Sequence, residues 1–194
     1  MKLARRANQR GNGKGCVMPD FESYVSATRA GTKPNHDGQP TAEPNRKGVY
    51  LHSGQIHVSD EPCSITTILG SCVAVCIWDA QREVGGATHY LLPHRVSGNN
   101  ASVRFGNCAI DQLLSKLLEM GAQKQNLQAK LFGGACIFAG FRKIEDQLGS
   151  KNVEIAVQML AEAAIPVITS DVGGAKGRKL IFNTDSGDAW IKLL

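Results

Sequence analysis

Apolar runs rich in β-branched or aromatic residues recur from about residue 48 to the end of the chain. Such runs, when turn residues bound them, predict β-strands. They cover residues 49–52, 65–69, 73–78, 84–92, 127–132, 167–169, 179–183 and 189–193. A Thr-Asp-Ser-Gly-Asp turn links the last two runs and predicts a hairpin.

Two further segments carry apolar residues at helical spacing. We expect Asn107 to cap the first helix and Gly121 to end it in the left-handed conformation. The second helix has an apolar face from Val153 to Ala164 and must stop before Pro166. Because strands outnumber helices and include a hairpin, the pattern predicts an α+β domain with two main helices on a mixed, largely antiparallel sheet.

Residues 1–47 differ from the rest of the chain in composition. They hold nine Lys or Arg against four Asp or Glu, which accounts for the whole net charge of +5, and four of the seven prolines. They contain no apolar run at either period, so we expect a disordered basic arm before a domain of residues 48–194. The arm also lacks the apolar stretch that a secretory signal or a membrane span of about 20 residues requires, so we expect no membrane insertion. Its scattered basic charge does not indicate a nucleic acid partner.

Six cysteines are spread over the chain: Cys16, Cys63, Cys72, Cys76, Cys108 and Cys136. No Cys-x-x-Cys pair occurs, and the spacing of four between Cys72 and Cys76 merely places both on one face of a strand. We therefore expect no metal site and no cofactor. Without a signal peptide, the cysteines indicate reduced thiols in the cytoplasm rather than a disulfide framework.

One cysteine and one histidine are positioned for chemistry. Cys72 follows a Gly70-Ser71 turn where a strand begins, and His89 lies in the next strand-like run. An adjacent imidazole can activate a thiol for attack on a carbonyl carbon, and the turn leaves backbone N–H groups for the resulting oxyanion. The alternative is that both are packing residues, since free cysteine is among the most buried residue types. Ser71 is a weaker candidate nucleophile because it lacks the Gly-x-Ser-x-Gly elbow.

Gly-Gly-Ala triplets begin at Gly85, Gly133 and Gly173. Glycines often end strands, but three such loops at neighbouring strand ends would also leave the backbone open around one pocket for a polypeptide substrate. We therefore include Gly133, Gly134, Gly173 and Gly174 among the candidate substrate-binding residues. The last triplet lacks the spacing of a phosphate-binding loop.

Several motifs, in this order, resemble CheD, the chemoreceptor glutamine deamidase family. They cover the chain from about residue 48 to its end. The motifs are Leu-Gly-Ser-Cys-Val-Ala-Val-Cys at 69–76, His89 with a Leu-Leu-Pro after it, Arg-Phe-Gly at 104–106, Lys-Leu-Phe-Gly-Gly-Ala at 130–135, Leu-Gly-Ser-Lys-Asn-Val at 148–153 and Asp-Val-Gly-Gly-Ala-Lys-Gly-Arg-Lys at 171–179. The resemblance implies a layered α/β sandwich like that of CheD and the cytotoxic necrotizing factor deamidases.

The resemblance also implies a reaction: hydrolysis of particular glutamine side chains on methyl-accepting chemotaxis receptors. By position, Cys72 matches the nucleophile, His89 the general base and acid, and Thr66 the hydroxyl that orients the histidine. Thr67, on the opposite strand face, is the alternative orienting residue. Gly70 and Ser71 are expected beside the oxyanion. Near the expected pocket the chain departs from the family at the residues before His89 and at Cys136, which puts substrate preference in doubt more than chemistry.

The resemblance leaves other functions open. The domain is either the amidohydrolase or chiefly a binding module that docks a receptor or a CheC-type phosphatase. A cysteine protease or an acyl transferase shares the attack step and differs in the bond cleaved or the acceptor. The presence of all three residue types, thiol, imidazole and hydroxyl, favours the enzyme.

Overall fold

The structure, a computed structural model, describes residues 46–94, 102–136 and 142–194. The arm predicted for residues 1–47 lies outside these residues except for Arg46 and Lys47. The elements are β1 (Lys47–Tyr50), β2 (Gln55–Ser59), β3 (Cys63–Leu69), β4 (Val73–Asp79), β5 (Val84–Tyr90), α2 (Gly106–Glu119), the 3₁₀ turn η1 (Lys124–Asn126), β6 (Leu127–Gly133), α3 (Arg142–Glu162), β7 (Val167–Val172), β8 (Arg178–Asn183) and β9 (Ala189–Leu193).

The strands form two sheets of mixed direction. The first has four strands in the order β1-β3-β8-β9, and the second has five in the order β2-β5-β4-β6-β7. Five of the seven strand pairs are antiparallel, and the parallel pairs are β1 with β3 and β6 with β7. The predicted hairpin is confirmed, because β8 and β9 pair antiparallel with Phe182 opposite Ala189.

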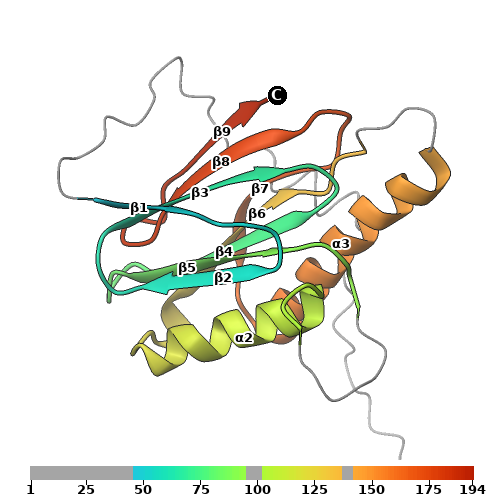
Figure 1. Cartoon of the computed structure of the whole chain (residues 1–194). Coiled ribbons are helices and arrows are strands. Elements are labelled where there is room, and N and C mark those ends of the chain that lie inside the picture. Colours follow the sequence, from blue (N-terminus) through green and yellow to red (C-terminus); the bar gives the residue numbers. More distant parts are fainter. Residues whose placement is uncertain (1–45, 95–101, 137–141) are drawn as a thin grey trace, which may run out of the picture.

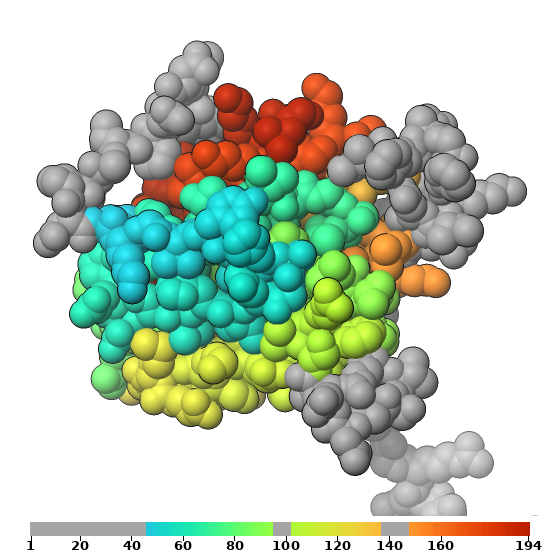
Figure 2. Space-filling view, in the orientation of Figure 1, coloured from blue at the N-terminus to red at the C-terminus, as the bar shows by residue number. Residues whose placement is uncertain are grey.

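The molecule has three layers (Figure 1), with the two helices on one face of the five-stranded sheet and the four-stranded sheet on its other face. In the space-filling view, the C-terminal strands lie at the top of the molecule, away from the layer of α2 (Figure 2). One core, with Val75, Ile77 and Leu113, fills the space between helices and sheet. A second core, with Ala74, Cys76 and Phe182, fills the space between the two sheets. Because β4 alternates its side chains between both cores, all seven of its residues are buried.

This architecture confirms the predicted α+β layered fold with two main helices. The left-handed stop at Gly121 is also confirmed, at a φ of 93°. Asn107 does not cap α2, because the helix begins one residue earlier and Phe105 occupies the cap position. The sequence pattern also missed β2, since Gln-Ile-His-Val-Ser carries too few apolar residues to stand out as a strand.

The ends of several strands, which carry or adjoin the predicted site residues, lie side by side at one end of the sheet. Val73, at the start of β4, pairs with Tyr90 at the end of β5 and with Gly133 at the end of β6. Gly133 in turn pairs with Val172 at the end of β7. The loop that carries Cys72 enters β4 at this same end of the sheet.

Candidate active site

The loop Gly70–Cys72 joins the two sheets, since it leaves β3 of one and enters β4 of the other. Two main-chain hydrogen bonds hold it against the end of β6. The Gly134 N–H donates to the Cys72 carbonyl at 2.8 Å, and the Ala135 N–H donates to the Gly70 carbonyl at 2.8 Å. Cys72 is partly exposed, so solvent reaches this loop.

His89 lies on β5 directly opposite Ala74 of β4. Ala74 faces the core between the two sheets, so His89 faces the same core. Cys72 lies in the loop one residue before β4, and the register continued by one pair would place it opposite Leu91, two residues beyond His89. The fold therefore leads the Cys72 loop into the strand next to the one that carries His89.

The hydroxyl beside the histidine belongs to Thr67, not to Thr66 as expected. On β3, Cys63, Ile65, Thr67 and Leu69 point into the space between the sheets, and the residues between them point outward. Thr67 Oγ1 lies 2.9 Å from His89 Nδ1, on the far side of that space. Thr66 faces outward beside Ile181 of β8. A shift of one residue in a strand reverses the face, and this explains the error.

The contacts of Thr67 determine which nitrogen of His89 carries the proton. The Thr67 hydroxyl also lies 2.7 Å from the Leu51 carbonyl oxygen, which can only accept. Because a hydroxyl has one proton, Thr67 donates it to Leu51 and must accept from His89 Nδ1–H. A neutral His89 then has an unprotonated Nε2, and this buried atom has no hydrogen-bond partner among the described residues. The Nε2 lone pair is therefore free to take a proton.

Burial favours the neutral forms of the His89 imidazole and the Cys72 thiol. Desolvation lowers the pKa of His89, the Leu51 carbonyl opposes this effect, and nearby His52 lowers the pKa further. Desolvation raises the pKa of the Cys72 thiol, while its own backbone N–H lowers it. Burial therefore favours a thiol and a neutral imidazole at rest, and an attack by the sulfur would require a base to take the thiol proton.

Backbone donors for an oxyanion are present in the Cys72 loop. Within the parts of the chain that the structure describes, the N–H groups of Ser71 and Cys72 donate to no backbone carbonyl. The Cys72 N–H is close enough to its own sulfur to favour the thiolate. A carbonyl carbon bonded to that sulfur would place its oxygen near the same N–H.

Two of the three Gly-Gly-Ala loops meet beside Cys72. The Gly173 N–H donates to the Gly133 carbonyl at 2.9 Å, and the Cys136 N–H donates to the Gly174 carbonyl at 2.8 Å. A Cβ at Gly133 would lie 2.2 Å from the Cys72 carbonyl oxygen, so only glycine permits this close approach. The third triplet is elsewhere: Gly85 is the second residue of β5, and a Cβ there would meet the backbone of Thr184. Its glycines serve strand packing.

Arg178 fixes the two glycine loops, and the sequence reasoning did not select it. Its side chain is buried, and its Nη1 donates to the carbonyls of Gly133 at 2.6 Å and Asp171 at 2.8 Å. Its Nη2 donates to the Gly173 carbonyl at 2.6 Å and lies 3.3 Å from an Asp171 carboxylate oxygen. A buried guanidinium needs several acceptors, and here the loop carbonyls supply them. The sequence signal that could have identified Arg178 was its position in the motif at residues 171–179.

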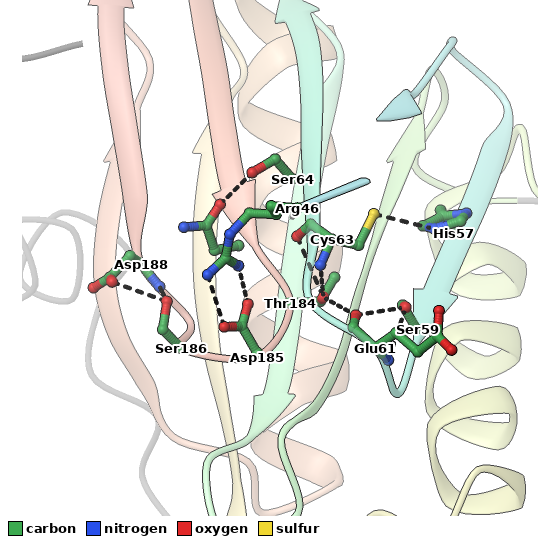
Figure 3. Close-up of polar contacts among 11 residues, drawn as sticks. Arg46, His57, Ser59, Glu61, Cys63, Ser64, Thr184, Asp185, Ser186 and Asp188 are labelled. Carbon is green, nitrogen blue, oxygen red and sulfur yellow. Dashed lines mark hydrogen bonds and ion pairs between the residues drawn. The ribbon is translucent and has the colours of Figure 1, made fainter. Parts of the chain in front are cut away.

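A second cysteine and histidine, Cys63 of β3 and His57 of β2, also lie close together (Figure 3). Cys63 Sγ is 3.6 Å from His57 Nε2, beside an ion pair of Arg46 with Asp185. Cys63 is 1% exposed, and burial raises its pKa.

No group of three or more His, Cys, Asp or Glu within the described residues is placed to hold a metal. Among the same residues, no helix has the length and apolar character to cross a membrane.

Comparisons with known proteins agree on one family. A family model described as CheD chemotactic sensory transduction matches residues 91–193. A protein of Anaeromyxobacter dehalogenans, named "Probable chemoreceptor glutamine deamidase CheD 1", is 47% identical over 87% of this chain and 94% of its own. Proteins of Trichlorobacter lovleyi and Sulfurimonas denitrificans, named "Probable chemoreceptor glutamine deamidase CheD", are 42% and 40% identical. These two matches cover 78% and 74% of this chain, and 90% and 92% of the relatives.

The comparison with solved structures is weaker. A Bacillus licheniformis structure titled hypothetical protein YfiH matches with a TM-score of 0.38 and 16% identity. The match covers 61% of this chain and 49% of that chain, and it is too weak to support an argument.

Proposed function

Because this chain belongs to the CheD family, we propose that it is a protein-glutamine deamidase that converts glutamine side chains of methyl-accepting chemotaxis receptors to glutamate. The observation that carries the proposal is the Thr67–His89 hydrogen bond. It leaves Nε2 of the imidazole without a partner among the described residues, and we propose that this nitrogen serves as the base for the Cys72 thiol. A thiol, a base and backbone donors are the parts that acyl transfer from a carboxamide needs.

In the first half of the reaction, Cys72 becomes acylated. His89 Nε2 takes the thiol proton as the sulfur attacks the carboxamide carbon, and the carbonyl oxygen becomes an oxyanion near the Cys72 N–H. The protonated imidazole then gives its proton to the amide nitrogen, the C–N bond breaks and ammonia leaves. A thioester between Cys72 and the glutamyl side chain remains. Thr67 holds the imidazole in one orientation throughout.

In the second half, water hydrolyses the thioester. His89 Nε2 takes a proton from the water as its oxygen attacks the thioester carbon. The proton returns to the sulfur when the C–S bond breaks, and the products are glutamate and the free thiol. The glycine loops at Gly133 and Gly173 lie beside the Cys72 loop, and we propose that they receive the backbone around the target glutamine. Gly134 and Gly174 belong to the same two loops and share this role.

We extend the proposal to compartment and partner. All five cysteines of the described residues are free thiols, as suits a reducing compartment such as the cytoplasm. A CheC-type phosphatase is a proposed partner on the resemblance alone.

The decisive experiment is a deamidation assay on receptor cytoplasmic fragments. Each hydrolysed glutamine gains about 1 Da, which mass spectrometry measures after proteolysis. We expect wild type and the control Cys108→Ala to convert receptor glutamines and Cys72→Ala to convert none. Wild type and Cys72→Ala leaving the glutamines equally untouched would refute the enzyme. Cleaved peptides or incorporated amines would instead indicate a protease or an acyl transferase.

A further inference from the structure

Asn152 is a fully buried polar residue of α3, beside the Cys72 loop and the end of β5. Its neighbours on the helix, Val153 and Ala156, pack in the core between helices and sheet. Burying an amide in such a core costs free energy unless the amide is hydrogen-bonded. Its Nδ2 donates to two carbonyls, those of Ser71 at 3.1 Å and Leu91 at 2.9 Å.

These two carbonyls belong to the two segments that carry the reactive residues. Ser71 precedes Cys72, and Leu91 follows His89 by two residues. The β4–β5 ladder ends at the pair of Val73 and Tyr90, so the next pair in register, Cys72 and Leu91, lies beyond it. The Asn152 amide thus bridges the two segments at the point where strand pairing stops.

The bond to Ser71 also determines where the Cys72 N–H points. The Ser71 carbonyl and the Cys72 N–H belong to one peptide unit, and in a planar trans peptide they point in opposite directions. Asn152 holds the carbonyl toward α3, so the N–H is turned away from the helix. This is the N–H that lies near the Cys72 sulfur and has no backbone acceptor in the described ranges.

The orientation of the amide is itself fixed. Two carbonyl oxygens can face only its NH₂ group, because an amide oxygen there would repel them. Its Oδ1 has no donor among the described residues. The Tyr90 hydroxyl donates to the main-chain carbonyl of Asn152, which ties the helix at this residue to the strand that carries His89.

We propose that Asn152 is a positioning residue that orients the Ser71–Cys72 peptide so that the Cys72 N–H donates a hydrogen bond to the oxyanion. The proposal rests on the proposed deamidase function. It predicts that loss of the Asn152 amide lowers kcat and leaves the KM for the receptor little changed, because the oxyanion forms only after binding.

The test compares Asn152→Leu with Leu160→Ala, which removes packing from the same helix and leaves the amide intact. We expect kcat for receptor deamidation to fall about 100-fold in Asn152→Leu, the loss typical of one oxyanion donor. We expect its KM to stay within about threefold of wild type. A kcat above about one third of the wild-type value would overturn the proposal, as would an equal loss of kcat in Leu160→Ala.

A second variant gives a readout that a merely structural role would not move. In Asn152→Asp, a carboxylate faces two carbonyl oxygens at high pH, whereas the protonated acid regains one donor. The kcat of this variant, as a fraction of the wild-type value, should therefore rise as the pH falls. A pH-independent fraction would count against the proposal even if Asn152→Leu failed to fold.

A third readout is independent of activity. Amide NMR spectra of protein labelled with ¹⁵N-cysteine contain one Cys72 signal, which its loss in Cys72→Ala identifies. That signal should move in Asn152→Leu or Asn152→Asp, while the Cys76 signal stays as in wild type. If wild type does not deamidate receptors, the proposed function fails and this signal alone decides the role of Asn152. An unmoved Cys72 signal would refute that role.

Discussion

Two pairs of cysteine and histidine can be compared among the residues that the structure describes. In the first, the Cys72 loop enters β4 next to β5, which carries His89, and we propose that the two react together. In the second, Cys63 and His57 are 3.6 Å apart (Figure 3). The pKa values do not distinguish them. Burial raises the pKa of both thiols and lowers that of both imidazoles.

The difference lies in the backbone around each thiol. Cys63 belongs to a strand, its N–H donates to Thr184 Oγ1 at 3.2 Å, and its carbonyl accepts from the Thr184 N–H at 3.0 Å. Cys72 lies in a loop, is partly exposed, and has an N–H without a backbone acceptor in the described residues. We therefore expect that a thiol beside an imidazole is not sufficient for catalysis. On this proposal, access for a substrate and free backbone donors distinguish the pair of Cys72 and His89 from the packed pair.

The largest expected effect is a loss of deamidase activity when His89 is replaced but not when His57 is replaced. Replacing His89 with alanine removes the base and acid of both half-reactions, so kcat/KM for receptor deamidation should fall about 10²–10⁴-fold. His57→Ala removes an imidazole that lies 3.6 Å from a buried thiol, and kcat/KM should stay within about threefold of wild type. Steady-state rates from the mass-spectrometric assay measure both. Equal losses in the two variants would mean that the reactive pair has been misassigned.

The next effect separates the two adjacent threonines. Thr67→Val keeps the shape of the side chain but removes the hydroxyl between His89 Nδ1 and the Leu51 carbonyl. A buried hydrogen bond contributes about 1 kcal/mol, so kcat should fall roughly fivefold. Thr66→Val, on the outward face of the same strand, serves as the matched control and should keep wild-type kcat. A larger loss in Thr66→Val would restore the assignment expected from the family resemblance.

These threonines also show how far the sequence determines the site. Strand and helix periods predict an α+β domain with two helices, and the family resemblance adds its layered arrangement. The Gly-Ser-Cys turn and the lone His89 predict the reactive pair. Family position selected Thr66, because no local signal reveals which of two adjacent threonines faces inward. That choice depends on the register of β3 against β8. Arg178 and Asn152 were missed for a related reason, since each binds a distant carbonyl: Gly133 lies 45 residues from Arg178, and Ser71 lies 81 residues from Asn152.

The smallest expected effect is a shift in pH dependence. Because burial lowers the pKa of His89, kcat/KM should be lost only as the pH falls through a value below the usual 6.5, where the imidazole becomes protonated and can no longer accept the thiol proton. The His52 charge adds to this lowering. Replacing His52 with glutamine should therefore raise the pKa of His89 and move the acid limb of the pH profile to higher pH, with plateau kcat/KM within about twofold of wild type. His57→Gln supplies the control, since Lys47, not His89, perturbs that imidazole by its charge. An acid limb that moves with His57 and not with His52 would assign the titrating base to the packed pair.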